Sequence, residues 1–147
     1  MKTKIFFGVF VLLFFAGCDK DNYNTVPTIS LESTSNKVVP FNGSFRVELR
    51  VTDKEGDISD TIYMKKIRKN QRTTTTIRDS LAFKIPEGPE TRNGFVTLDL
   101  LYENHLKAAI NPGSPVQNDT LTIQLTVRDK AKNKSEPLNI DNVVIIR

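Results

Sequence analysis

The chain has 147 residues, a formal net charge of +4, one cysteine and no tryptophan. A single cysteine excludes a scaffold held together by internal disulfides. So small a net charge excludes the strongly basic proteins that bind nucleic acid through their overall field. The length allows one domain with a hydrophobic core of its own.

The chain begins with the features of a secretory signal. Lys2 and Lys4 precede an apolar run of 11 residues, Ile5 to Phe15, whereas a helix needs about 20 residues to cross a bilayer. A basic start, a short apolar core and small residues at the break are typical of a cleaved signal peptide. Residues 1–17 hold two of the 21 basic residues and none of the 17 acidic ones, so the mature chain carries a net charge of +2.

The end of this signal supplies an anchor residue. The stretch Phe15-Ala16-Gly17-Cys18 resembles a bacterial lipobox, with phenylalanine where that motif prefers leucine. The resemblance implies a signal peptide over 1–17, lipidation of Cys18, and attachment to a membrane through the N-terminal lipid.

Residues 18–26 are short, polar and without periodicity, and we expect them to form a tether. The acidic run Asp19-Lys20-Asp21 resembles the surface-export signal of Bacteroidota lipoproteins, which implies an outer-membrane protein exposed at the cell surface. It also resembles the aspartate that retains enterobacterial lipoproteins in the inner membrane, so a periplasm-facing position is the alternative. A soluble linker fits either destination.

Residues 27–147 are expected to form the folded domain, and its first strands are defined by alternation. Pro27 to Glu32 places Ile29 and Leu31 on one face, and a polar loop follows over 33–43. The clearest strand is Ser44 to Thr52. Its apolar side chains occupy every second position, as in a strand with one buried face; they are Phe45, Val47, Leu49 and Val51.

The rest of the chain continues the β pattern. We expect strands over 61–68, 73–85, 95–101, 120–128 and 142–146, with a hairpin turn at 69–72. The longest connection, 102–119, is expected to contain a short helix over 103–110 that ends before Asn111-Pro112-Gly113. Seven short strands with one buried face each predict an all-β fold, an antiparallel β-sandwich.

Two turns carry a resemblance to a known fold. Asp53-Lys54-Glu55-Gly56-Asp57, and the loop with Asp129, Asn133 and Ser135, are similar to turns of the immunoglobulin-like and cadherin-like domains of bacterial surface proteins. The resemblance covers about residues 27–147 and implies an immunoglobulin-like sandwich.

That topology implies two poles. At the N-terminal pole we expect the start of the domain and the loops that begin at Asp53, Pro86 and Asp129. At the C-terminal pole we expect the loop 33–43, the hairpin 69–72, the segment 102–119 and the chain end.

The N-terminal pole would gather acidic side chains. The candidate metal ligands are Asp53, Glu55, Asp57, Asp129 and Asn133, with Asp60 nearby. Calcium takes six to eight hard oxygen ligands, many of them carboxylates on turns. Zinc prefers nitrogen and sulfur, and no histidine lies near. The alternative is that Asp and Gly only form the turns, with Lys54 and Lys130 balancing the charge.

A basic group is expected around the hairpin at the C-terminal pole. Such a patch could bind an anionic glycan or a lipid headgroup. Charged edge strands also prevent edge-to-edge association, which is the alternative and the one we favour. The residues are Lys65, Lys66, Arg68, Lys69 and Arg72.

Three short stretches resemble the O-glycosylation motif of Bacteroidota, an Asp followed by Ser or Thr and an apolar residue. The acceptors would be Thr61, Ser80 and Thr120. The alternative is an Asp that closes a turn before a strand, which accounts well for the first and third stretches.

Catalytic residues are sparse. His105 is the sole histidine, no cysteine remains in the mature domain as a nucleophile, and no serine lies in a nucleophile elbow. Glu87 and Glu90 lie three apart in one loop, where a carboxylate pair seldom flanks a sugar. We therefore expect a non-enzymatic protein.

The expected role is that of a lipid-anchored envelope protein with a binding or structural function, as an accessory subunit of a surface complex. Its partner would be a protein or a glycan and not nucleic acid. The alternatives are a polysaccharide-binding accessory of a glycan-utilisation system and a calcium-stabilised adhesin module.

Overall fold

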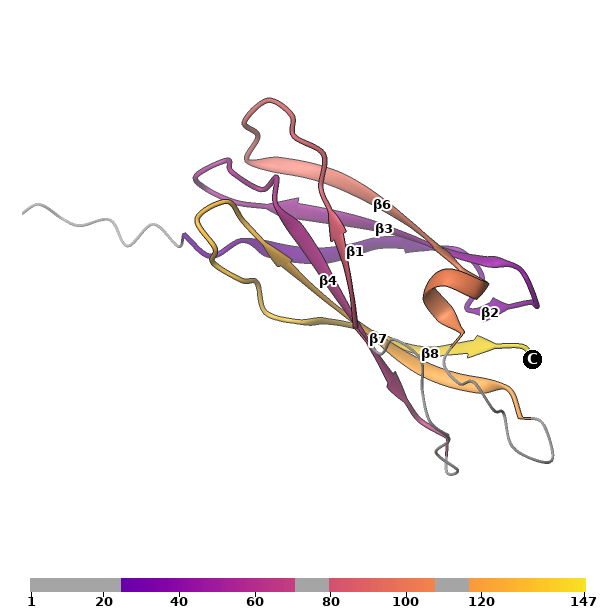
Figure 1. Cartoon of the computed structure of the whole chain (residues 1–147). Helices are drawn as coiled ribbons and strands as arrows, with labels where there is room; N and C mark the ends of the chain where they lie inside the picture. The colour runs from indigo at the N-terminus through magenta and orange to yellow at the C-terminus, as the bar shows by residue number, and fades with distance from the viewer. Residues whose placement is uncertain (1–24, 71–79, 108–116) are drawn as a thin grey trace, which may run out of the picture.

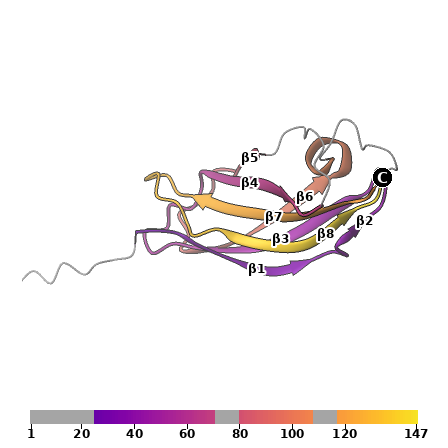
Figure 2. The ribbon, with the colours of Figure 1, turned by 90° about the horizontal axis from the view of Figure 1, so that it is seen from below.

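A computed structural model describes residues 25–70, 80–107 and 117–147. Within them, two sheets pack face to face (Figures 1 and 2). One sheet has the strand order β1-β3-β6 and the other β2-β8-β7-β4-β5. The strands are β1 (Thr28–Thr34), β2 (Val38–Val39), β3 (Ser44–Thr52), β4 (Thr61–Arg68), β5 (Ser80–Lys84), β6 (Asn93–Leu101), β7 (Asp119–Arg128) and β8 (Leu138–Ile145).

These strands form the expected immunoglobulin-like sandwich. Neighbouring strands are antiparallel except for β2 and β8, which are parallel. β3 and β4 have the predicted bounds, and β1, β6 and β7 differ from prediction by one or two residues at an end. The all-β class predicted from the sequence is therefore confirmed, with the short β2 added to the seven expected strands.

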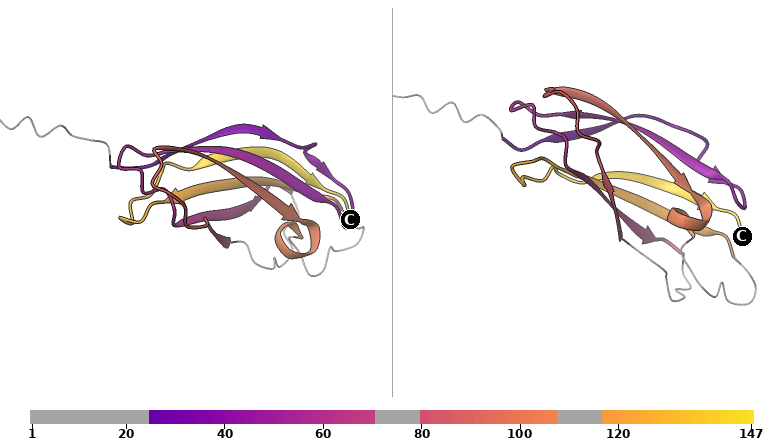
Figure 3. Two further views of the ribbon diagram at one scale, coloured as in Figure 1. Left: turned by 90° about the horizontal axis from the view of Figure 1, so that it is seen from above. Right: turned by 45° about the horizontal axis from the view of Figure 1, so that its top comes forward.

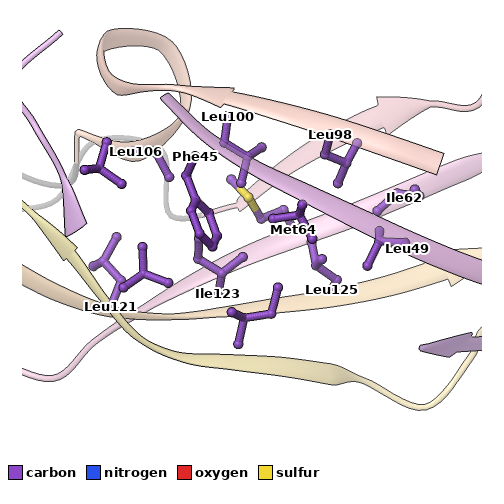
Figure 4. Close-up of a cluster of buried hydrophobic side chains, with 14 of the residues drawn as sticks. Phe45, Leu49, Ile62, Met64, Leu98, Leu100, Leu106, Leu121, Ile123 and Leu125 are labelled. Carbon is purple, nitrogen blue, oxygen red and sulfur yellow. The ribbon is translucent and has the colours of Figure 1, made fainter. Parts of the chain in front are cut away.

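The core lies between the sheets because each long strand turns every second side chain inward. Figure 4 shows these side chains meeting in the space between the two sheets. β3 and β7 contribute four side chains each, and all eight are fully buried: Phe45, Val47, Leu49, Val51, Leu121, Ile123, Leu125 and Val127. Apolar packing between two alternating faces thus holds the domain together.

β8 begins at Leu138, four residues before the start at Asn142 that the sequence predicted. The alternation is broken inside the strand, since Ile140 and Val143 are both buried although they lie three apart. Asn142 has φ 61°, and the pairing with β7 shifts register between Leu121 and Ile123. A bulge of this kind hides a strand from a period-2 pattern.

The predicted loop 33–43 is partly strand. β1 runs on to Thr34, and the two residues of β2 pair with the end of β8. Val39 is fully buried, and its carbonyl accepts from Ile146 N at 2.9 Å. Two residues are too few to show a periodic pattern, so the sequence does not predict β2. Its pairing with β8 stabilises it.

The predicted helix 103–110 is instead a single π-helical turn, η1 (Tyr102–Leu106). Lys107 N donates to Tyr102 O at 2.7 Å and closes this turn. Tyr102 and Leu106 are buried, and they fix the turn against the sandwich. Residues 108–110 lie outside the described residues, as do 73–79 of the predicted fourth strand, whose described part is β5.

The two poles are arranged as expected (Figures 1 and 3). At the N-terminal pole, Asn133 Nδ2 donates to Thr25 O at 3.1 Å and Asp53 N donates to Arg92 O at 3.0 Å. At the C-terminal pole, Tyr102 N donates to Gly43 O at 2.9 Å, and the chain ends near η1. In the described part of the chain, no helix has the length and apolarity that a membrane crossing needs.

Candidate functional site

Two turns meet at the N-terminal pole and bring acidic side chains together. Asp53 follows β3, and Asp129 follows β7. Gly56, with φ 83°, lets the first turn reverse tightly. The second turn is bound to the first, because Lys130 N donates to Asp57 O and Ala131 N donates to Asp57 Oδ2, both at 3.1 Å.

Three carboxylates converge where these turns meet. Oxygens of Asp53, Asp57 and Asp129 all lie within 4.8 Å of one another. Asp53 is 4% exposed and Asp129 is fully buried, whereas Asp57 is half-buried. Three negative charges at this distance, two of them buried, repel one another strongly, because burial weakens the screening by water. Such a group needs a proton, a donor or a cation to relieve the repulsion.

The hydrogen bonds of the three carboxylates are unequal. Asn133 satisfies both oxygens of Asp129, its backbone N at 2.8 Å and its Nδ2 at 3.0 Å. Asp53 Oδ1 accepts from Glu55 N at 3.4 Å. Asp53 Oδ2 and Asp57 Oδ1 are buried and have no hydrogen-bond partner among the residues that the structure describes. Acceptor capacity is therefore left over in the middle of the cluster.

The two unsatisfied carboxylates are coupled electrostatically. Interaction with the neighbouring Asp53 carboxyl, burial, and the negative charge of Asp53, in that order, raise the pKa of Asp57. Two carboxyl groups this close resist being ionised together. The raised pKa thus reports the same crowding of negative charge as the distances.

Asn133 connects the cluster to the start of the domain. Its Nδ2 donates to Asp129 Oδ2 and also to Thr25 O, at 3.0 and 3.1 Å. Thr25 belongs to the predicted tether 18–26. The side chain of Asn133 is therefore a direct link between the carboxylate cluster and the segment that leads toward Cys18. Cys18 itself lies outside the described residues.

Two other acidic residues of this pole stand apart from the cluster. Glu55 is exposed and does not lie within reach of the three carboxylates. Asp60 Oδ2 accepts from Arg128 Nε at 2.6 Å and Lys132 Nζ at 3.2 Å. The Arg128 hydrogen bond and the Lys132 ammonium lower the pKa of Asp60 to about 2. Of the five predicted ligands, the structure unites Asp53, Asp57 and Asp129, with Asn133 attached.

The predicted basic patch is only partly exposed. Lys66 shares the inward phase of β4 with Ile62 and Met64; it is 4% exposed, and its Nζ donates to Lys107 O. Arg68 pairs with the buried Asp119. These two side chains are therefore not part of an exposed basic surface. Lys65 and Lys69 are exposed, and Arg72 lies outside the described residues.

The three predicted acceptor residues differ in exposure. Thr61 is 6% exposed, and its hydroxyl donates to Asp60 Oδ1, so it lacks the exposure that a glycan acceptor needs. Thr120 is half-buried. Ser80 is exposed at the start of β5 and lines a hollow of about 300 Å³ with Tyr63, Gln124 and Lys134.

His105 is half-buried and has a structural role. Its Nδ1 accepts from Leu101 N at 2.9 Å, and its ring packs edge-on against Phe83. Burial, followed by the charge of Lys66, lowers the pKa of this histidine. Glu87 and Glu90 are both exposed.

One buried charge cluster was missed by the sequence reasoning. Asp119 is 1% exposed and pairs with both Arg68 and Arg147. It joins the end of β4 to the chain end at the C-terminal pole. The sequence carries no clear signal of this cluster, because Asp119 fits both the first residue of a glycosylation motif and the closing residue of a turn.

No protein-family model matches this chain, and no curated protein matches it.

Proposed function

We propose that this protein is a lipid-anchored, non-enzymatic envelope protein of the outer membrane, with a binding or structural role as an accessory subunit of a surface complex. Two observations support this proposal. Thr25 is held at the N-terminal pole, and Phe41, Val38 and Leu101 are exposed at the opposite one.

The anchor would keep the N-terminal pole near the membrane. Thr25 follows Cys18 by seven positions in the chain, and an extended chain spans at most about 3.6 Å per position, or about 25 Å in total. β1 leads away from that pole toward η1 and the chain end (Figure 1). The C-terminal pole would therefore meet a partner first.

That pole carries the features of a protein contact. Phe41 is 61% exposed beside Tyr102, with ring centroids 5.2 Å apart. Val38 and Leu101 are 47% and 46% exposed. Exposed aromatic and aliphatic side chains are the usual anchors of protein interfaces. A protein partner is favoured for this reason.

The test is crosslinking in intact cells from a photoreactive residue at position 41. We expect one defined adduct with an envelope protein, and no such adduct from position 54 at the N-terminal pole. Phe41→Ser should abolish copurification of that same protein without lowering the amount of the anchored chain. Equal adducts from both positions would refute the role of the C-terminal pole.

A glycan ligand is the alternative, and the hollow beside Ser80 is the observation that favours it. Tyr63 lines this hollow. Its ring already contacts two cations, since Arg128 and Lys134 lie 5.2 and 5.3 Å from the ring centre. Glycan-array binding that is lost in Tyr63→Ala and kept in Phe41→Ser would support this alternative over the protein partner.

A further inference from the structure

The carboxylate cluster at the N-terminal pole contains an unmet demand for positive charge. Asp53 is 4% exposed, and its Oδ2 has no partner among the described residues. A buried carboxylate oxygen without a partner is costly. A cation bound from solution would satisfy it.

Two cations of this pole are engaged elsewhere. Arg128 and Lys132 both bind Asp60. Asn133 donates two hydrogen bonds to Asp129 and one to Thr25, and none of the three reaches Asp53 or Asp57. The two open oxygens, Asp53 Oδ2 and Asp57 Oδ1, belong to the same trio of carboxylates within 4.8 Å.

The donor set defines the class of ligand. It consists of carboxylate oxygens, which are hard ligands and suit calcium. His105 lies at the other pole, so the nitrogen and sulfur ligands that zinc prefers are lacking among the described residues here. Magnesium demands near-ideal octahedral geometry, whereas calcium accepts the irregular spacing of ligands from two turns.

We propose that Asp53, Asp57 and Asp129 bind one calcium ion, and that Asn133 couples its binding to the docking of the N-terminal segment at Thr25. Asp53 Oδ2 and Asp57 Oδ1 supply the open ligand atoms. Each Asp129 oxygen accepts one hydrogen bond and retains a second lone pair for the ion. Water completes the coordination on the side of the exposed Lys54 and Glu55.

The bound ion would stiffen the junction with the membrane tether. It joins the turn after β3 to the turn after β7, and Asn133 extends this connection to Thr25. Its affinity should lie in the range of extracellular calcium modules, about 10⁻⁴ to 10⁻³ M. This inference is independent of the proposed partner at the C-terminal pole and of the chemistry at Cys18.

The first experiment measures calcium binding to the purified full-length protein in detergent, after removal of metals by a chelator. Wild type and the control Asp60→Asn should each bind one ion per chain with a similar Kd. Asp57→Asn should bind at least about tenfold more weakly. The control removes a carboxylate of the same pole that is already paired with Arg128.

Thermal melting distinguishes a variant that has lost calcium binding from one that is misfolded. Without calcium, Asp57→Asn should melt at or above the wild-type temperature, because the substitution removes a repelling charge. With calcium, the melting temperature of wild type and Asp60→Asn should rise, and that of Asp57→Asn should not. Sodium chloride of equal ionic strength should not reproduce the rise. A wild type that does not bind calcium in the millimolar range, or equal responses of the two variants, overturns the site.

The second experiment tests the coupling through hydrogen exchange. Calcium should slow amide exchange in the two turns, 53–57 and 129–133, and around Thr25 in the wild type. Asn133→Ala should keep the protection of the turn 53–57 and lose it around Thr25. Undiminished protection around Thr25 in this variant would refute the coupling.

Discussion

At the scale of single residues, the alternation of β3 and β7 determines which side chains carry the stability. Leu49 and Leu125 are both fully buried between the sheets, one from each sheet. Arg50, next to Leu49, points to the other face; it pairs with Glu32 at 2.6 Å and lies 5.1 Å from the centre of the Phe95 ring.

We therefore predict that Leu49→Ala and Leu125→Ala each lower the free energy of unfolding by about 2–5 kcal/mol. Arg50→Ala should cost about 1 kcal/mol or less, because its ion pair with Glu32 is partly exposed to solvent. Urea denaturation of the three variants measures this difference. Equal losses at all three positions would contradict the buried phase of β3.

A second prediction at this scale concerns acid. The pKa of Asp60 is lowered to about 2 by Arg128 and Lys132, from an ordinary value of 3.8. A lowered pKa stabilises the fold while the carboxylate is ionised, and this contribution is lost as the pH falls through the folded value. The stability that wild type holds over Asp60→Asn should thus be constant near neutral pH and shrink between about pH 4 and pH 2.

Urea denaturation at a series of pH values tests this. Asp99→Asn is the matched control, because the partner of Asp99, Arg46, is more than half exposed and the pair should contribute less. A difference between wild type and Asp60→Asn that is the same at pH 2 and pH 7 would show that the Arg128 pair adds no stability.

At the scale of elements, the bulge in β8 shows how a strand can depart from its pattern. Asn142 has φ 61°, a left-handed conformation that asparagine and glycine adopt more readily than other residues. This left-handed residue forms the bulge, and the bulge allows Ile140 before it and Val143 after it both to face the core.

Asn142→Val should accordingly lower the free energy of unfolding by about 1–2 kcal/mol, the cost of left-handed backbone for a side chain with a Cβ, while Asn142→Gly should be near neutral. Thermal melting of the pair compares them directly. A valine variant as stable as the glycine variant would mean that β8 can pair without the bulge.

At the scale of the whole molecule, the position of Thr25 sets the orientation that a short tether would impose. Lys54 and Lys69 are both exposed, at the N-terminal and the C-terminal pole. The first should be shielded by the membrane and the second should face outward.

We predict that, on intact cells, a bulky thiol reagent labels Lys69→Cys faster than Lys54→Cys. After solubilisation in detergent, the two rates should become similar, which controls for local reactivity. Faster labelling at position 54 on cells would refute the orientation, whereas labelling of neither position would place the protein on the periplasmic side.

The sequence by itself determined the sandwich class, the bounds of β3 and β4, and the assignment of the acidic turns to the N-terminal pole. The strand bounds follow from local information, because a period of two is visible within one strand. The poles follow from chain order in the immunoglobulin-like topology that the two turns resemble. The tertiary structure alone decided which acidic residues meet. Asp60 is taken by Arg128 and Lys132, Glu55 points to solvent, and Lys66 lies in the core. Such choices depend on distances between segments far apart in the chain, and no local pattern contains them.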